Sequence, residues 1–231
     1  MDLSENGGIR LNVFVNKLLN DSFRIHLDCW ADTILYSAGA AWLEVAAGDP
    51  DIQVGQWGTQ EHHPWYQSQI ATSAHIAFPS PYSTPPKVIL WLNEVDMAKD
   101  KGWRVNSYAS NITTTGFDIH IDTWADTRLY SGTAYWIAYP ADKAHITSGT
   151  VATGPNPKSL ANSGTVTFPN GVFDTPPRVL MAVNEMDFGT GKGLRFRMYT
   201  DSVTKSGMTW HINSWADSVV NSVGASWIAL P

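Results

Sequence analysis

Cysteine and charge are both scarce in this chain. Its 231 residues include one cysteine, Cys29, so neither an intramolecular disulfide nor a cysteine-based zinc site can form. Only 16% of the residues are charged, 21 acidic against 15 basic, and no basic run occurs. Binding to a nucleic acid or to an anionic membrane requires a basic face, so we expect neither partner. We also expect no cofactor, because no glycine-rich phosphate loop is present.

Long apolar runs are absent as well. The longest, such as residues 88–92, have the length of a strand and fall far short of the ~20 residues of a membrane-spanning helix. Residues 1–8 are acidic where a signal peptide would be basic, and no apolar region follows them. We therefore expect no membrane insertion. The location stays unknown, with the cytoplasm or a non-classical route of release as the two expectations.

Tryptophan, by contrast, is abundant with 11 residues, and it marks an internal repeat. In each of three segments a Gly-x-Arg sequence precedes Trp-Ala-Asp-Thr or Trp-Ala-Asp-Ser, with Arg and Trp 20 residues apart, and a second Trp follows 12 residues later. The arginines are Arg10, Arg104 and Arg195, at offsets of 94 and 91 residues. This spacing indicates small domains of about 90 residues rather than a short solenoid unit.

The first repeat is shorter than the other two. The second and third share an upstream half with Phe-Pro, Thr-Pro-Pro and Asn-Glu-x-Asp sequences, and the first has no such half. We predict a partial repeat over residues 1–46 and complete repeats over 47–141 and 142–231. Half of a small sandwich leaves an apolar face open, so we also predict tight packing between repeats.

Alternating apolar and polar residues predict an all-β fold. Before the first repeated Trp of the second repeat, Phe117, Ile119 and Ile121 alternate with polar residues, and the other repeats alternate in the same way. We expect about six strands per complete repeat, arranged as tandem antiparallel β-sandwiches. Three of the polar positions are histidine, namely His26, His120 and His211. We hypothesise a single-chain pseudo-threefold assembly in which these rings meet at the axis, as stacked neutral imidazoles rather than as a metal site.

The repeated sequence resembles the H-type lectin domain of snail agglutinins and discoidin carboxyl-terminal domains. In the second repeat the resemblance is carried by Phe78-Pro79, Tyr82-Ser83-Thr84-Pro85-Pro86, Gly116-Phe117, the segment from Trp124-Ala125-Asp126-Thr127 to Tyr130, and Tyr135-Trp136-Ile137-Ala138. It covers residues 52–139 and 146–230 as whole domains and 8–46 as a half. It implies six-stranded sandwiches, trimers, and galactose or N-acetylgalactosamine bound in clefts between neighbouring protomers.

The resemblance also implies which residues contact the sugar. Carried over by position, they are the arginines Arg10, Arg104 and Arg195, the tryptophans Trp30, Trp124 and Trp215, and the tyrosines Tyr36 and Tyr130. Asn221 occupies the tyrosine position in the third repeat. An aromatic face and a few fixed donors and acceptors are what a sugar requires, and the arginine fork supplies donors.

Further candidates follow from the residues themselves. The carboxylates Asp32, Asp126 and Asp217 are candidate acceptors for sugar hydroxyls, with hydrogen bonding to their own turns as the alternative. Trp65 and Tyr66 lie in a ring-rich loop of the second repeat, which is either a specificity loop or a cover for the open half repeat. We expect no catalytic residue and no metal ligand.

Three functional classes remain to be compared. Glu94 with Asp96, and Glu185 with Asp187, have the i, i+2 spacing of a carboxylate pair about 7 Å apart. Because no cleft-building insertion accompanies either pair, glycoside hydrolysis is disfavoured. A structural or attachment module would use the same sandwich without binding sugar. We favour a non-catalytic, multivalent lectin for galactose or N-acetylgalactosamine glycans, with homo-oligomerisation left open.

Overall fold

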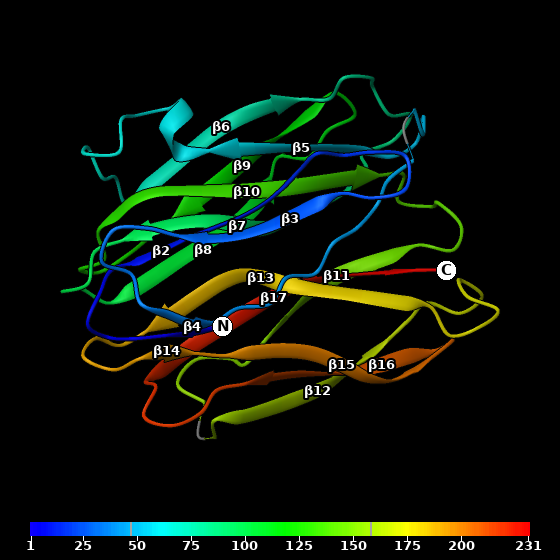
Figure 1. Ribbon diagram of the computed structural model, residues 1–231. Coiled ribbons are helices and arrows are strands. Elements are labelled where there is room, and N and C mark those ends of the chain that lie inside the picture. The colour runs from blue at the N-terminus through cyan, green and yellow to red at the C-terminus, as the bar shows by residue number, and fades with distance from the viewer. Residues whose placement is uncertain (47, 158) are drawn as a thin grey trace.

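The computed structural model describes residues 1–46, 48–157 and 159–231. These residues form β-strands and one short 3-10 helix, η1 (Thr59–Glu61), so the predicted all-β class is confirmed (Figure 1). The strand pairs are antiparallel. Among the described residues, no helix is long and apolar enough to cross a membrane.

The second repeat is a sandwich of two sheets. Its strands are β5 (Gln53–Gly58), β6 (Ala71–Ala77), β7 (Lys87–Met97), β8 (Trp103–Ser110), β9 (Gly116–Asp122) and β10 (Leu129–Tyr139). β5, β10 and β7 form one sheet, while β8, β9 and β6 form the other. Phe117 and Ile119 on β9 are fully buried, as their alternation predicts, and Phe117 packs edge-on against Trp136. The core therefore lies between the two sheets.

The third repeat has the same plan. Its strands are β11 (Thr147–Ala152), β12 (Ala161–Thr167), β13 (Arg178–Phe188), β14 (Leu194–Arg195), β15 (Arg197–Thr204), β16 (Gly207–Asn213) and β17 (Val220–Leu230). β11, β17 and β13 form one sheet, and β12, β16 and β15 form the other. Phe168 packs on the buried Trp227 between them, as Phe78 packs on Trp136 in the second repeat.

The first repeat contains a hairpin and two short strands. The hairpin consists of β2 (Ile9–Asn16) and β3 (Arg24–Cys29), which correspond to β8 and β9 of the second repeat. The short strands are β1 (Asp2–Leu3) and β4 (Leu35–Ser37). β4 is the counterpart of the 11-residue β10, and it ends early because the first repeat lacks the counterpart of β5 on which β10 pairs.

Strands of neighbouring repeats pair with each other, and these pairings close the three repeats into a ring. β2 pairs with β7, β8 pairs with β13, and β14 pairs with β1. In Figure 1 the first repeat accordingly bridges the other two, with β2 and β3 among the strands of the second repeat and β1 and β4 beside the third. The pseudo-threefold arrangement expected from the sequence follows from these three equivalent pairings.

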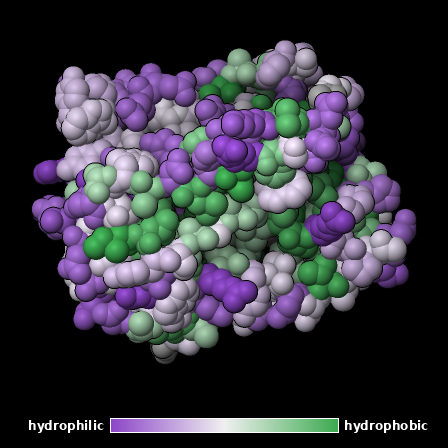
Figure 2. All heavy atoms as spheres, in the orientation of Figure 1, coloured by the Kyte–Doolittle hydropathy of each residue, from purple (hydrophilic) through white to green (hydrophobic). Residues whose placement is uncertain are grey.

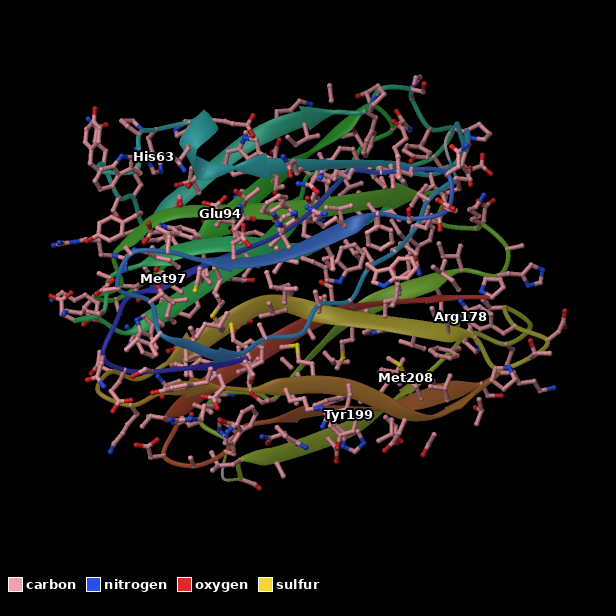
Figure 3. The ribbon with its side chains drawn as sticks, in the orientation of Figure 1. His63, Glu94, Met97, Arg178, Tyr199 and Met208 are labelled. Atoms are coloured by element: carbon pink, nitrogen blue, oxygen red, sulfur yellow. The ribbon has the colours of Figure 1, made fainter. Side chains whose placement is uncertain are left out.

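One buried cluster contains side chains from all three repeats, among them Ile9, Met97 and Phe188. Met97 lies between the upper and lower groups of sheets in Figure 3. Packing between repeats is therefore tight where strands pair. The inner face of the first repeat remains open, however, since Trp42 is 52% exposed whereas its counterparts Trp136 and Trp227 are each 5% exposed.

Candidate functional site

Each Trp-Ala-Asp sequence forms a tight turn at the end of a strand. The alanines at its centre, Ala31, Ala125 and Ala216, have left-handed backbone angles with φ of 54°, 55° and 56°. In the second repeat the Thr127 N–H donates to the Trp124 carbonyl at 3.3 Å and closes the turn. A left-handed conformation costs a non-glycine residue roughly 1 kcal/mol. Three identical instances therefore indicate that each repeat requires this turn geometry.

The turn is fixed to the Gly-x-Arg sequence on the neighbouring strand. The Thr127 hydroxyl donates to the Gly102 carbonyl at 2.5 Å, and the Ser218 hydroxyl donates to the Gly193 carbonyl at 2.6 Å. A side chain at Gly102 would collide with the guanidinium of Arg104, which folds back over this glycine. These contacts explain why Gly-x-Arg and Trp-Ala-Asp-Thr or Trp-Ala-Asp-Ser occur together in every repeat.

Each repeated arginine lies between two carboxylates from different repeats. Arg104 Nη1 contacts Asp126 Oδ1 of its own repeat at 2.6 Å, and Arg104 Nε contacts Asp187 Oδ1 of the third repeat at 3.2 Å. The same ion-pair triad recurs twice, and its members are Asp217, Arg195 and Asp2 in one case and Asp32, Arg10 and Asp96 in the other. The three triads therefore mark three equivalent seams between repeats.

The charges of the triads alter carboxylate titration. A hydrogen bond from Arg104 lowers the pKa of Asp126. Hydrogen bonds from Lys192 and, less strongly, from Arg195 lower the pKa of Asp217. Burial acts to raise the pKa of Asp32, but the Arg10 charge and backbone hydrogen bonds together outweigh burial, so the pKa is lowered. Burial raises the pKa of Asp96, although Arg10 and a hydrogen bond from Trp30 act in the opposite direction. Asp32, Asp126 and Asp217 are thus ionised acceptors at neutral pH.

Every seam combines residues from two repeats. At the second seam, between the second and third repeats, Trp124 Nε1 donates to Asp187 Oδ2 at 3.3 Å and Asn221 Nδ2 donates to Asp187 Oδ1 at 2.9 Å. Asn221 has the chain position of a tyrosine in the other repeats. Trp124 and Asn221 therefore meet on one carboxylate, although they belong to different repeats.

Tyr130 and Tyr36 each lie at a seam other than that of the arginine in their own repeat. Tyr130 precedes Ser131, which pairs with Asp96, so Tyr130 belongs to the first seam with Arg10 and not to the seam of Arg104. Tyr36 lies between the β4 residues that pair with Asp2 and Leu3, so it belongs to the third seam with Arg195. The predicted residues divide as follows: Arg10, Trp30, Asp32, Tyr130, Trp65 and Tyr66 at the first seam; Arg104, Trp124 and Asp126 at the second; Arg195, Trp215, Asp217 and Tyr36 at the third.

The ring-rich loop lies beside the first seam. Trp65 is exposed and packs edge-on against Tyr130 at 6.0 Å and against Tyr66 at 5.8 Å. The loop is held by His63, which is buried and hydrogen-bonds to Thr72 Oγ1 at 3.2 Å; Figure 3 shows His63 next to η1. Trp65 therefore packs on Tyr130 of the first seam, and Tyr66 packs on Trp65.

The corresponding loop of the third repeat has no such rings. Its sequence is Gly154-Pro155-Asn156-Pro157, and the Asn156 N–H donates to the Asn221 carbonyl at 2.6 Å. The first repeat has neither the loop nor the two strands that flank it in the complete repeats. The three seams thus share a framework, which is the ion-pair triad with its tryptophan. They differ at the rim, which is the tyrosine or asparagine and the loop beside it.

Sequence reasoning missed the second carboxylate of each triad. Asp96 and Asp187 were considered only as partners of Glu94 and Glu185 in a hydrolytic pair. In the structure Glu94 accepts hydrogen bonds from Ser131 at 2.9 Å and Thr133 at 3.1 Å within its own sheet, where Figure 3 places it. Asp2 was not considered at all, although its place before Leu3 matches that of Asp96 before Met97. This short match is the signal that could have identified it.

The hypothesis that three histidines meet at the axis is wrong. Each ring stacks on an aromatic ring of its own repeat, His26 on Phe14 at 4.5 Å, His120 on Tyr108 at 4.4 Å and His211 on Tyr199 at 4.5 Å. The interior where strands of different repeats meet is apolar instead. Within the described ranges, no group of three or more His, Cys, Asp or Glu side chains could hold a metal ion.

Comparison with known proteins agrees with this architecture. The chain matches the H-type lectin domain over residues 1–43, 73–139 and 163–230, which together make up more than half of its length. A curated relative, "ATP synthase subunits region ORF 7" of Fuscovulum blasticum, is 38% identical over 63 residues, which is 27% of this chain and 55% of that protein. The chain thus spans about half the length of this relative. The chain belongs to the H-type lectin domain family, whose domains are carbohydrate-binding and in general not catalytic.

Proposed function

We propose that the protein is a multivalent lectin that binds galactose-type or N-acetylgalactosamine-type glycans at the seams between its repeats, without catalysis. The observation that carries this proposal is the threefold recurrence of a partly exposed tryptophan beside an arginine held by two carboxylates. An indole face stacks on the apolar C–H patch of a pyranose ring. Carboxylate oxygens and guanidinium N–H groups then order the hydroxyls around that ring.

Occupation of more than one seam would determine the strength of binding. A single site with one ring and a few hydrogen bonds binds in the mM to µM range, that is, with about 4 to 8 kcal/mol. Two or three sites on one rigid ring raise the apparent affinity for a dense glycan surface by roughly 10² to 10⁴. Agglutination of erythrocytes, inhibited by galactose or N-acetylgalactosamine and not by mannose, tests the proposal. A glycan array with no galactose-type hits would contradict it.

A structural or attachment module is the second candidate, and the triads themselves favour it. Arg104 Nη1 and Nε contact carboxylates of two different repeats, so this arginine can serve to join the repeats rather than to bind a sugar. Replacing Trp30, Trp124 and Trp215 together by Ala distinguishes the two functions, because it alters all three seams and the indoles are not part of the ion pairs. Loss of glycan binding with an unchanged fold supports the lectin. No glycan binding by the unaltered protein supports the module.

A further inference from the structure

The first repeat leaves one strand edge of the ring open. In the second repeat the outer edge of β9 pairs with β6 over its whole length, and in the third repeat the outer edge of β16 pairs with β12. β3 is the counterpart of both strands and ends its sheet, and no strand in the described part of the chain pairs with its outer edge. An unpaired edge of this length is a template for another strand.

Apolar side chains surround this edge. Leu18 and Leu19, in the turn that leads into β3, are 77% and 65% exposed. Trp42 packs edge-on against Phe23 at 4.9 Å, and its other side is open where the complete repeats place a phenylalanine. Figure 2 shows apolar groups across the middle of the face on which β3 and β4 lie in Figure 1. Contiguous exposed apolar surface of this kind indicates an interaction site.

The charged side chains of β3 are arranged so that two copies of this strand can pair with opposite charges facing each other. Arg24 and Asp28 lie on the same face of the strand, two residues on either side of His26. If two β3 strands pair antiparallel with His26 at the centre, each Arg24 lies directly opposite Asp28 of the second chain. On the other face, Ile25 lies opposite Leu27 of the second chain. A twofold interface needs this kind of self-complementary patch.

The second repeat shows how the same edge is used when it is covered. There Asp118 occupies the position of Arg24 and contacts His75 of the covering strand β6 at 2.9 Å, in register across the strand pair. A hydrogen-bonded pair of polar side chains on facing residues therefore already holds one strand on this edge. In the first repeat, Arg24 and Asp28 provide both members of such a pair within one strand.

We propose that the protein forms a twofold dimer in which β3 pairs antiparallel with β3 of a second chain. The pairing makes one continuous sheet through both rings, from β5 of one chain to β5 of the other. It provides hydrogen-bond partners for the free backbone groups of β3. It also places Ile25 and Leu27 of one chain opposite Leu27 and Ile25 of the other. If the proposed lectin function holds, dimerisation also doubles the number of seams in one particle.

Sedimentation equilibrium tests this interface. We expect the unaltered protein to be a dimer, and Arg24→Asp to weaken it by about tenfold in Kd, because two aspartates then face each other at both ends of the strand pair. Asp28→Lys should weaken it similarly by placing a lysine opposite Arg24. The double variant Arg24→Asp, Asp28→Arg restores opposite charges and should restore the dimer. Lys205→Asp, which makes the same charge change on the exposed turn between β15 and β16, is the control.

A monomeric unaltered protein would overturn the proposal. So would a dimer that both single charge variants leave intact and that only Trp42→Ser dissociates, because the partner would then cover the apolar face without pairing to the edge. Far-ultraviolet circular dichroism and the melting temperature of each variant verify that the ring is folded. If Arg24→Asp does not fold, Asp28→Lys and the double variant still decide the question.

Discussion

The first and second seams have the same framework and different rims. Both contain an arginine between two carboxylates and a tryptophan at a strand end. The rim of the first adds Tyr130, Trp65 and Tyr66, whereas the rim of the second adds Asn221 and a proline-rich loop. Because the ion pairs link neighbouring repeats at both seams, a difference in what the two seams bind would have to come from the rim.

The largest expected effect is on binding at the aromatic seam. Trp30→Ala combined with Trp65→Ala should reduce glycan affinity at the first seam about 100-fold, near 2.7 kcal/mol, because both stacking faces are lost. Titration calorimetry with a soluble glycan would resolve this as the loss of one class of sites. Trp124→Ala, which alters the second seam alone, is the matched control. Equal losses from both variants would mean that the seams do not differ.

The next effect concerns the shared framework. Arg104→Ala should lower the free energy of unfolding by about 2 kcal/mol, since Asp187 loses its charged partner while its side chain is only 15% exposed. Urea denaturation would measure the change. Arg178→Ala, at an exposed position on β13, should change stability little. An Arg104→Ala variant as stable as the unaltered protein would show that this arginine does not join the repeats.

Exchanging the rim residues should exchange part of the specificity. Tyr130→Asn in the first seam and Asn221→Tyr in the second should change glycan affinity about fivefold, near 1 kcal/mol, in opposite directions, because a ring is removed in one and added in the other. Paired glycan-array profiles would reveal the exchange. Changes in the same direction would contradict a role for this position in recognition.

The smallest effect is the acid response, which should differ between two carboxylates of the triads, Asp126 and Asp96. Asp126 has a lowered pKa, so its contribution to stability is present above its unfolded pKa of about 3.9 and disappears as the pH falls through the lower folded value. The melting temperatures of the unaltered protein and Asp126→Asn should therefore converge in strong acid. Asp96 has a raised pKa, so its protonation favours the folded state as the pH falls. Near neutral pH Asp96→Asn should therefore melt at or above the temperature of the unaltered protein, the opposite sign to Asp126→Asn, and this difference should also disappear in acid.

Much of the fold was predictable because its signals are local. Alternation on β9 and β16 identified core positions such as Phe117, and the recurrence of Trp-Ala-Asp identified three equivalent turns. β5 and β11 are difficult to place from the sequence, because each contains a glycine, Gly55 or Gly149, that interrupts the alternation. In the structure each glycine lies under a tryptophan ring of the neighbouring strand and leaves room for it.

The grouping of the candidate residues was not predictable. Tyr130 is six residues from Trp124 in the chain but lies at the seam of Arg10, because β2 and not β8 pairs with the strand next to it. Asp2 joins Arg195 across nearly the whole chain. Such pairings depend on how repeats associate, and periodicity within one repeat contains no information about that association.

The short β1 has a consequence for how the protein is made. Asp2 and Leu3 pair with Arg195 and Leu194 of the third repeat, so these residues must wait for a strand that is made much later. Contacts between residues so far apart in sequence form slowly, because a long loop must close first. Until then the second and third repeats can fold as units, while the amino-terminal segment remains exposed to chaperones and proteases.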